Sequence, residues 1–183
     1  VQAPFFVGDW QSEKWFINCR EEIIKAFTFK NISSQNKLEA EKMEEVESVS
    51  IHIRRGDYIG NKVYENCATP EYYKKAIEYI KTIHPACVFW VFSNDVEWCK
   101  CNLAEQFGDN VYYVDWNTGS DSYQDMYLMS RCKHNIISNS SVSGWGAYLN
   151  QNPNKVVIAP QKWFNTDNAN TYKDIVPENW IRL

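Results

Sequence analysis

The sequence contains no apolar run close to the ~20 residues that a membrane-spanning helix needs. Its first residues also lack the basic segment and the long apolar stretch of a signal peptide. We therefore expect a cytoplasmic protein with no transmembrane segment, whose only membrane contact would be peripheral association with the inner membrane. Because the sequence does not begin with Met, we also expect it to be a fragment.

Basic charge is scarce in this sequence. The net charge of −4 argues against nucleic acid partners, because proteins that bind the phosphate backbone carry a basic surface. Only five arginines are present, and two of them, Arg54 and Arg55, are adjacent. A guanidinium group can donate two parallel hydrogen bonds to a phosphate. The side chains best suited to binding phosphate are thus concentrated at one point of the chain.

Paired cysteines are also lacking. The six cysteines are scattered without a disulfide framework, and a chain of 183 residues can be stable without such crosslinks. Cys99 and Cys101 are two positions apart with no His nearby, which does not match the spacing of zinc ligands. We expect incidental, reduced thiols and no bound metal.

From residue 48 onward, short apolar segments alternate with segments of helical periodicity. This alternation predicts an α/β fold, a Rossmann-like parallel sheet with helices on both faces. Strands are predicted over residues 49–53, 87–92, 111–114, 135–138 and 155–159. Helices are predicted over residues 70–83, 96–107, 122–132 and 141–149, with a short helix or turn at 177–181.

Residues 1–47 differ from the rest in composition. We interpret them as the end of a preceding domain and a connector, followed by a single domain over residues 48–183. An amphipathic helix is expected within the first thirty residues, with four side chains facing inward: Trp15, Ile23, Ile24 and Phe27. Residues 31–47 are polar and then rich in Glu and Lys, a composition that suits a solvated connector or a surface helix.

The segment 49–58 reads as a strand that breaks at Gly56. Side chains alternate along a strand, so the apolar residues share one face and His52 and Arg54 share the other. A buried guanidinium needs an anionic partner, because burying an unpaired charge is costly. Two interpretations stay open: an internal ion pair with Asp57, or a phosphate site at the carboxyl end of a strand.

Four predicted strands end in polar residues, at 54–58, 93–95, 115 and 139–143. The carboxyl ends of parallel strands lie at one edge of a sheet, so these residues should converge. Ser140, Ser141 and Ser143 open a predicted helix, whose first amides can bind an anion. An ordinary serine N-cap is the alternative. Taken with Arg54, this helix start suggests a diphosphate site that needs no metal.

Asp125 has two interpretations. It follows Ser122 at the spacing of a capping box, which would give it a purely structural role. It could instead be a carboxylate that accepts two hydrogen bonds from the edge of a guanine. His52 could likewise contact a nucleotide or bond to a neighbouring backbone carbonyl.

Several segments resemble the signatures of the α-1,2-fucosyltransferase family. Residues 52–58, His-Ile-Arg-Arg-Gly-Asp-Tyr, resemble its first signature, residues 91–95, Val-Phe-Ser-Asn-Asp, its second, and residues 129–141 its third. Residues 10–16 are similar to the segment that precedes the first signature in bacterial members. Residues 159–164 and 177–180 fit the tail of the family. The resemblance covers nearly the whole chain in the right order.

The resemblance implies the donor-binding, C-terminal half of a GT-B-like glycosyltransferase. Such an enzyme transfers L-fucose from GDP-β-L-fucose to the 2-hydroxyl of a galactoside acceptor, with inversion and without a metal. Arg54 would grip the β-phosphate as the catalytic residue, and His52 and Asp125 would contact the guanosine. The diphosphate cradle would be completed by Ser140, Ser141 and the backbone of Val142. Further donor-site residues are expected in the same motifs: Arg55, Asp57, Ser93, Asp95 and Asn139.

The chain also departs from the family pattern. It lacks the glycine-rich opening stretch of bacterial members, so we expect the first domain, with much of the acceptor cleft, to be missing. Asn94 and Gly144 stand where Asp and Trp are common. A catalytically inert sugar-nucleotide-binding module is therefore one alternative, and a different phosphate-handling α/β enzyme is another. The sequence does not indicate which residue would act as the general base.

Overall fold

The protein is built on a six-stranded sheet in which all strands are parallel. The computed structural model describes residues 10–183, so the part of the predicted connector region over residues 1–9 lies outside the described residues. In the spatial order of the sheet, the strands are β3 (Val111–Val114), β2 (Val88–Ser93), β1 (Ser48–Ile53), β4 (His134–Ile136), β5 (Val157–Ala159) and β6 (Ile181–Arg182). The predicted Rossmann-like α/β fold is confirmed.

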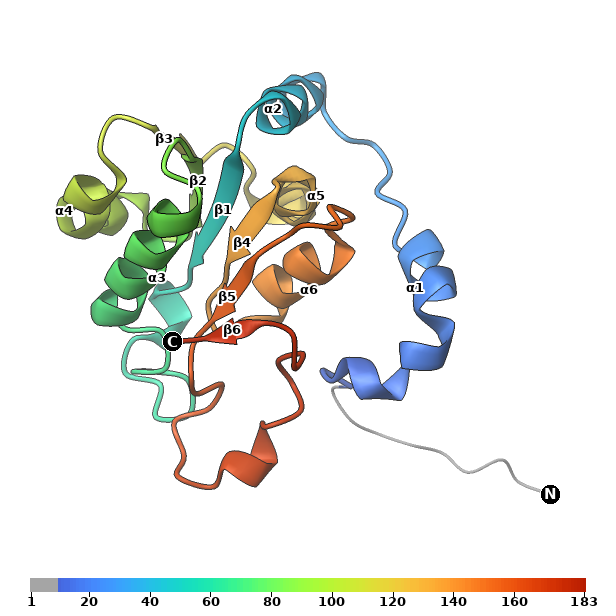
Figure 1. Ribbon diagram of the computed structural model, residues 1–183, viewed down its shortest axis with the longest axis vertical. Helices are drawn as coiled ribbons and strands as arrows, with labels where there is room; N and C mark the ends of the chain where they lie inside the picture. The colour runs from blue at the N-terminus through green and yellow to red at the C-terminus, as the bar shows by residue number, and fades with distance from the viewer. Residues whose placement is uncertain (1–9) are drawn as a thin grey trace.

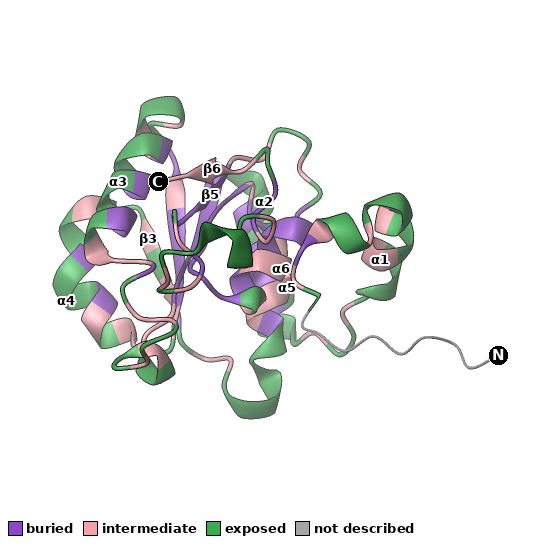
Figure 2. Cartoon of the chain, turned by 90° about the horizontal axis from the view of Figure 1, so that it is seen from below, coloured by how far each residue is buried: buried purple, intermediate pink, exposed green. Residues whose placement is uncertain are grey.

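Helices cover both faces of the sheet (Figure 1). One face carries α3 (Pro70–Ile83) and α4 (Val96–Phe107), and the other carries α5 (Tyr123–Arg131) and α6 (Ser141–Leu149). Figure 2 shows that the buried residues are concentrated in the strands and on the inner sides of these helices. No helix within residues 10–183 is long and apolar enough to cross a membrane.

The central strand β1 is buried along its whole length. Val49 and Ile51 pack in the same apolar cluster as the inner side of α3. On the opposite face, Ser50 Oγ accepts a 2.7 Å hydrogen bond from Asn135 Nδ2. Since side chains alternate along a strand, His52 lies on the Ser50 face, as the sequence predicted. This alternation directs the last polar side chains of β1 away from the α3 side of the core.

Helix α3 fixes the carboxyl ends of three strands. Its first turn is capped by Thr69, whose Oγ1 accepts a 3.2 Å hydrogen bond from the Tyr72 amide. The single proton of the Tyr72 hydroxyl is shared between the carbonyls of Ile137 and Ile158, at 2.7 and 3.0 Å. The neighbouring Tyr73 hydroxyl donates to the His52 carbonyl at 3.2 Å. Both phenols thereby satisfy buried carbonyl groups just where β1, β4 and β5 end.

The first described segment is more exposed than predicted. It forms η1 (Glu13–Trp15), η2 (Ile17–Cys19) and α1 (Arg20–Ala26), none of which has a buried residue. The prediction that Trp15 and Phe27 face inward is wrong, because these side chains are 67% and 38% exposed. Ile23 and Ile24 are only half-buried. Phe27 stacks instead on Trp145 of α6, with the ring centroids 4.4 Å apart, and α1 stands apart from the sheet in Figure 1.

The end of the chain agrees with the prediction only in part. A turn is present where we expected a short helix or turn, since the Trp180 amide donates to the Pro177 carbonyl at 3.1 Å. The next two residues, however, form β6, which extends the sheet beyond β5. A two-residue strand gives almost no periodic signal, so the sequence pattern could not predict it.

Residues 31–47, expected to be a solvated connector or a surface helix, contain α2 (Ser34–Glu45). Ser33 caps this helix by accepting a 3.2 Å hydrogen bond from the Asn36 amide. One side of α2 is buried, and Met43 packs in the same apolar cluster as Trp90 of β2. Glu39 accepts a 2.7 Å hydrogen bond from the Trp90 indole. Helix α2 is therefore packed against the sheet layer rather than solvated on all sides.

Candidate functional site

A crevice with a volume of about 520 Å³ opens at the carboxyl ends of β1, β2 and β3. We call it the strand-end crevice. Pockets for small molecules are typically of about 300–1,000 Å³, so this volume is adequate for a nucleotide. Five of the predicted site residues line it: His52, Arg54, Ser93, Asp125 and Val142. The predicted convergence of strand ends with the start of α6 is thus present in the structure.

Arg54 lies at the wall of the strand-end crevice, with its side chain 35% exposed. Its Nε is 2.8 Å from Asp57 Oδ1, and the hydrogen bond from the guanidinium, together with its positive charge, lowers the pKa of that carboxyl. The ion pair that the sequence left open is therefore present. It uses Nε, and among residues 10–183 no hydrogen bond engages either Nη group. An ion pair and a phosphate site at Arg54 are thus compatible.

The backbone after Arg54 is held in an unusual conformation. Gly56 has φ of +27°, which other residues rarely adopt. A Cβ atom at Gly56 would come within 2.3 Å of Asn94 Nδ2. Asn94 cannot easily yield, because its Oδ1 accepts a 2.9 Å hydrogen bond from the Arg55 amide. The contact between Gly56 and Asn94 therefore fixes the turn that positions Arg54.

Helix α6 brings its amino-terminal turn to the crevice through Val142. The N-cap residue is Ser140, whose side chain makes no capping hydrogen bond. The ordinary serine cap is therefore not formed, and the first amides of the helix remain available to an anion. Gly146 lets α6 approach α5 closely, since a Cβ there would be 2.8 Å from Met129 Cβ.

The strand-end crevice is also lined by Asp125 and Asn117. The capping-box interpretation of Asp125 is wrong, because Ser122 makes no side-chain cap and its hydroxyl donates to the Gly119 carbonyl. Asp125 Oδ1 instead accepts a 2.8 Å hydrogen bond from Asn117 Nδ2. Burial raises the pKa of Asp125 to about 6, although the bond from Asn117 opposes this shift. A half-buried carboxylate with a free oxygen suits a ligand that donates two hydrogen bonds.

His52 is buried beside Ser138, with 2.9 Å between Nδ1 and Ser138 Oγ. Burial lowers the pKa of His52 to about 3, and the charge of Arg54 adds to this shift. The imidazole is therefore neutral near pH 7. Since the contact with Ser138 uses Nδ1, a ligand in the crevice could bond to Nε2.

Other predicted site residues hold the strand ends together. Ser93 Oγ donates to the Ile53 carbonyl at 2.8 Å and joins the ends of β1 and β2. Arg55 lies with its guanidinium 3.9 Å from the Trp98 ring centroid, and its Nε is 3.1 Å from Asp95 Oδ2. Asp95 also caps α4. These contacts place Arg55 and Asp95 beside α4 rather than in the strand-end crevice.

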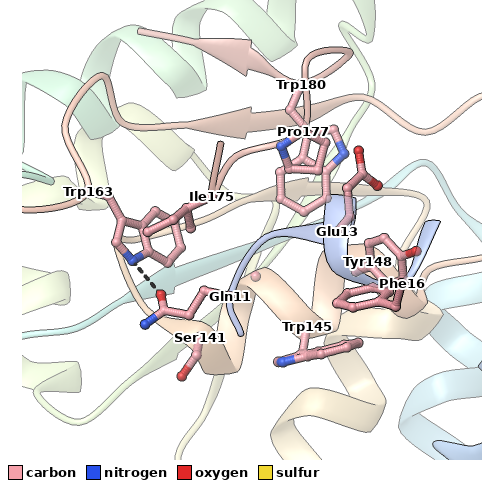
Figure 3. Close-up of a pocket in the computed structure, with 11 residues that line it drawn as sticks. Gln11, Glu13, Phe16, Ser141, Trp145, Tyr148, Trp163, Ile175, Pro177 and Trp180 are labelled. Carbon is pink, nitrogen blue, oxygen red and sulfur yellow. Dashed lines mark hydrogen bonds between the residues drawn. The ribbon is translucent and has the colours of Figure 1, made fainter. Parts of the chain in front are cut away.

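The strand-end crevice is not lined by Asn139 or Ser141. Asn139 Nδ2 donates to the carbonyls of Tyr64 and Trp163, at 3.1 and 3.0 Å, so the amide holds two loops. Ser141 is exposed and lines a separate aromatic hollow, drawn in Figure 3.

The aromatic hollow is framed by Trp145, Trp163 and Trp180, with Gln11 bonded to the Trp163 indole (Figure 3). Aromatic rings often bind sugars, but this hollow has a volume of only about 40 Å³. That is far below the ~300 Å³ at the lower end for ligand pockets. Its residues come from residues 11–16, α6 and the 160–180 region, so it is a packing seam between these segments.

Sequence reasoning missed Asn117 and Ser138. Asn117 follows β3 in the run Asp-Trp-Asn-Thr-Gly, and a polar run after a strand is the signal that could have indicated it. Ser138 was included in a predicted strand, whereas the structure ends β4 at Ile136. It is therefore free to meet His52 across the strand ends.

The fold and the crevice define an α/β domain whose strand ends form a crevice lined by Arg54. Residues 2–183 match glycosyl transferase family 11. The chain belongs to this family.

Three curated relatives are similar to the chain. The "Alpha-1,2-colitosyltransferase" of Escherichia coli is 40% identical over 97% of this chain and 62% of its own length. The "O-antigen biosynthesis glycosyltransferase WbnK" of Escherichia coli is 41% identical over 76% of the chain and 46% of its own length. The "Galactoside alpha-(1,2)-fucosyltransferase 1" of Ateles belzebuth is 35% identical over 55% of the chain and 28% of its own length. The chain thus spans less than two thirds of each relative.

Among solved structures, the "Thermosulfurimonas dismutans KpsC, beta Kdo 2,7 transferase" aligns with a TM-score of 0.37 and 14% identity, over 76% of this chain and 45% of its own. This likeness is too distant to inform the site.

Proposed function

We propose that the chain binds GDP-β-L-fucose and supports transfer of fucose to the 2-hydroxyl of a galactoside, with inversion at the anomeric carbon. The observation that carries this proposal is that Arg54 and the first turn of α6 line one crevice. The family membership and the names of the relatives support a sugar-nucleotide donor. The chain would supply the donor-binding part of a GT-B-like enzyme.

In the proposed reaction, negative charge builds up on the β-phosphate as its bond to the fucose breaks. The two Nη groups of Arg54 and the amides that begin α6 would stabilise this charge from the same crevice. Donors that are already in place need not reorganise during the reaction, which makes such stabilisation effective. We therefore propose that Arg54 is catalytic and that the transfer proceeds without a metal ion.

The guanine would lie at the Asp125 end of the crevice. A carboxylate can accept two hydrogen bonds from the N1 and N2 positions of guanine, and Asn117 holds one oxygen of Asp125 in place. His52, neutral and fixed by Ser138, would contact the nucleoside between the base and Arg54. The predicted contributions of His52 and Asp125 are therefore retained in the proposal.

A colitose donor is the second candidate, because the relative named as a colitosyltransferase is 40% identical over nearly the whole chain. Colitose is the 3-deoxy analogue of fucose, so the two donors differ by one hydroxyl group. A site that hydrogen-bonds this hydroxyl discriminates strongly against the analogue that lacks it. Transfer rates measured with GDP-fucose and GDP-colitose would distinguish the two functions.

Calorimetry with GDP-fucose, GDP-mannose and UDP-galactose tests the proposed function. We expect the two GDP-sugars to bind and UDP-galactose not to bind, because Asp125 would accept hydrogen bonds that guanine can donate and uracil cannot match. Tighter binding of the uridine donor would contradict the proposal and favour a different phosphate-handling enzyme. Transfer to lactose by the intact protein then separates an active transferase from an inert binding module.

A further inference from the structure

Arg54 lines a second cavity as well as the strand-end crevice. This cavity has a volume of about 250 Å³ and lies between the loop after β1 and the start of α3. Its lining includes Tyr58, Tyr64, Glu65 and Asn139. We call it the Glu65 cavity. Its volume is close to the lower end of the range for small-ligand pockets, which suits a single sugar unit.

The loop that carries Glu65 is held on both sides. Asn139 Nδ2 donates to the Tyr64 carbonyl at 3.1 Å, and the Asn165 amide donates to the Val63 carbonyl at 2.7 Å. The Glu65 amide itself donates to the Asn61 carbonyl at 2.9 Å. A group fixed in this way can be positioned accurately for catalysis.

The carboxylate of Glu65 is the unpaired acid of this region. Glu65 is half-buried, and within residues 10–183 its side chain has no hydrogen-bond or ion-pair partner. The other two acids near the β1 loop are engaged, Asp57 with Arg54 and Asp95 with Arg55. The guanidinium of Arg54 also lowers the pKa of Asp57, which makes that carboxylate a weaker base.

Two aromatic side chains line the cavity. Tyr58 and Tyr64 stack with their centroids 4.9 Å apart, and the Tyr58 hydroxyl donates to the Asn139 carbonyl at 3.1 Å. Aromatic faces offer apolar contact, to which the C–H face of a galactose ring is well matched. The cavity thus combines two aromatic side chains with an unpaired carboxylate, and Arg54 lines it too.

We propose that the Glu65 cavity binds the galactoside acceptor and that Glu65 is the general base of the transfer. This inference rests on the proposed function. An in-line displacement needs the attacking hydroxyl and the leaving phosphate on opposite sides of the anomeric carbon. The two cavities that meet at Arg54 would provide these two positions, with the donor in the strand-end crevice and the acceptor in the Glu65 cavity.

The proposed transfer needs only the donor, the acceptor, Arg54 and Glu65. The 2-oxygen of the galactoside forms a bond to the anomeric carbon of fucose while the bond from that carbon to the β-phosphate oxygen breaks. The electron pair of the broken bond stays on GDP, next to Arg54. The hydroxyl proton passes to the Glu65 carboxylate, which later releases it to water.

The test is Glu65→Gln in the intact protein, with Glu71→Gln as the matched control. Glu71 is exposed in the first turn of α3 and lines neither cavity. A general base contributes about 10²–10⁴-fold, so we expect kcat to fall by at least about 100-fold in Glu65→Gln. The affinity for GDP, measured by calorimetry, should be unchanged, which also shows that the variant is folded. Glu71→Gln should transfer at the wild-type rate.

Transfer by Glu65→Gln within a few fold of the wild-type rate would overturn Glu65 as the base. A wild-type protein that does not bind GDP would instead contradict the proposed function. Acceptor placement is tested without turnover, by NMR detection of lactose binding in the presence of GDP. Tyr64→Leu should weaken lactose binding about tenfold and leave GDP binding unchanged, and unchanged lactose binding would overturn the acceptor placement.

Discussion

At the scale of single residues, the turn after β1 determines where Arg54 lies. Gly56 has a positive φ, and Asn94 leaves no space for a Cβ atom there. We predict that Gly56→Ala lowers the free energy of unfolding by more than the ~1–3 kcal/mol of a strained backbone position alone, because Asn94 must also move. Urea denaturation would measure this loss. Gly108→Ala is the control, since Gly108 has φ of +70° but open space around it, and an equal loss would show that Asn94 is not involved.

The fork geometry of Arg54 leads to a second prediction. A lysine can supply the positive charge but not two parallel hydrogen bonds. We predict that Arg54→Lys lowers the transfer rate by about 10²–10³-fold, the usual loss when one group that stabilises transition-state charge is removed. Arg54→Ala should abolish turnover. The comparison is Arg131→Lys, at an exposed ion pair with Glu44 on the surface. An Arg54→Lys enzyme with full activity would refute the two-bond role.

Asp125 should make GDP binding depend on pH. Its pKa of about 6 means that the carboxylate is mostly ionised at pH 7 and mostly protonated at pH 5. Only the ionised form accepts both guanine hydrogens, so we predict that affinity falls on the order of tenfold between pH 7 and pH 5. Calorimetry at both pH values measures this change.

Asp125→Asn should weaken GDP binding at pH 7 by about 10- to 100-fold, as expected for hydrogen bonds to a charged group. It should also remove the dependence on pH, whereas Asp109→Asn, at an exposed position, should leave both unchanged. The same pH dependence in Asp125→Asn would mean that another group titrates.

Residue patterns predicted some parts of this site and not others. Arg54, His52 and the start of α6 could be found because strand alternation and parallel topology together fix where strand ends point. The environment of Asp125 could not be predicted, because the spacing from Ser122 fits a capping box that does not form. Its partner Asn117 is supplied by a loop of irregular conformation, and no periodicity indicates such a contact.

At the scale of elements, α2 holds the loop that follows β3. Asn36 is fully buried, and its Nδ2 donates to Asn117 Oδ1 at 2.8 Å and to Gln124 Oε1 at 2.7 Å. Its Oδ1 accepts a 2.8 Å hydrogen bond from the Trp116 indole. Because Asn117 in turn bonds to Asp125, α2 supports one end of the strand-end crevice through a polar network.

We predict that Asn36→Ala lowers the free energy of unfolding by about 1–3 kcal/mol, since it leaves buried polar groups without partners. It should also weaken GDP binding, because Asn117 and Asp125 lose their support. Denaturation and calorimetry measure the two effects. Gln35→Ala, at an exposed position of the same helix, is the control. Normal GDP affinity in Asn36→Ala would show that the network does not reach the crevice.

The long elements were predictable and the short ones were not. Helices α3 and α4 have caps and three or more turns of periodic apolar residues, and their observed bounds match those predicted. Helix α1 has seven residues and no buried side chain. The orientation of Phe27, which follows it, is set by stacking on Trp145 rather than by packing in the core. Only contact with β5 makes Ile181–Arg182 a strand.

At the scale of the whole molecule, buried histidines should make stability depend on pH. His52 has a pKa of about 3 in the folded protein against 6.5 when unfolded, so the unfolded state binds the proton more readily. The stabilisation that neutral His52 provides is fully present above pH 6.5. It is lost progressively as the pH falls from 6.5 towards 3. The loss at pH 5 is on the order of 2 kcal/mol. Burial likewise lowers the pKa of His134, which adds to the loss.

Asp125 acts in the opposite direction, because its pKa is higher in the folded protein than in the unfolded one. Its charged form opposes folding above about pH 6, and this penalty decreases as the pH falls. We therefore predict that Asp125→Asn is more stable than the wild type at pH 7 and loses more stability between pH 7 and pH 5. Denaturation curves of both proteins at the two pH values test this, and parallel losses would contradict it.

The packing of α2 has a practical consequence for anyone who shortens this chain. A version that starts at β1 would keep all six strands and so would look like a natural unit on a topology diagram. It would nevertheless leave the Trp90 indole and the Gln124 amide facing water where Glu39 and Asn36 now meet them. The proposed guanine site would be impaired before the sheet itself failed. Cloning boundaries should therefore be set ahead of Ser33.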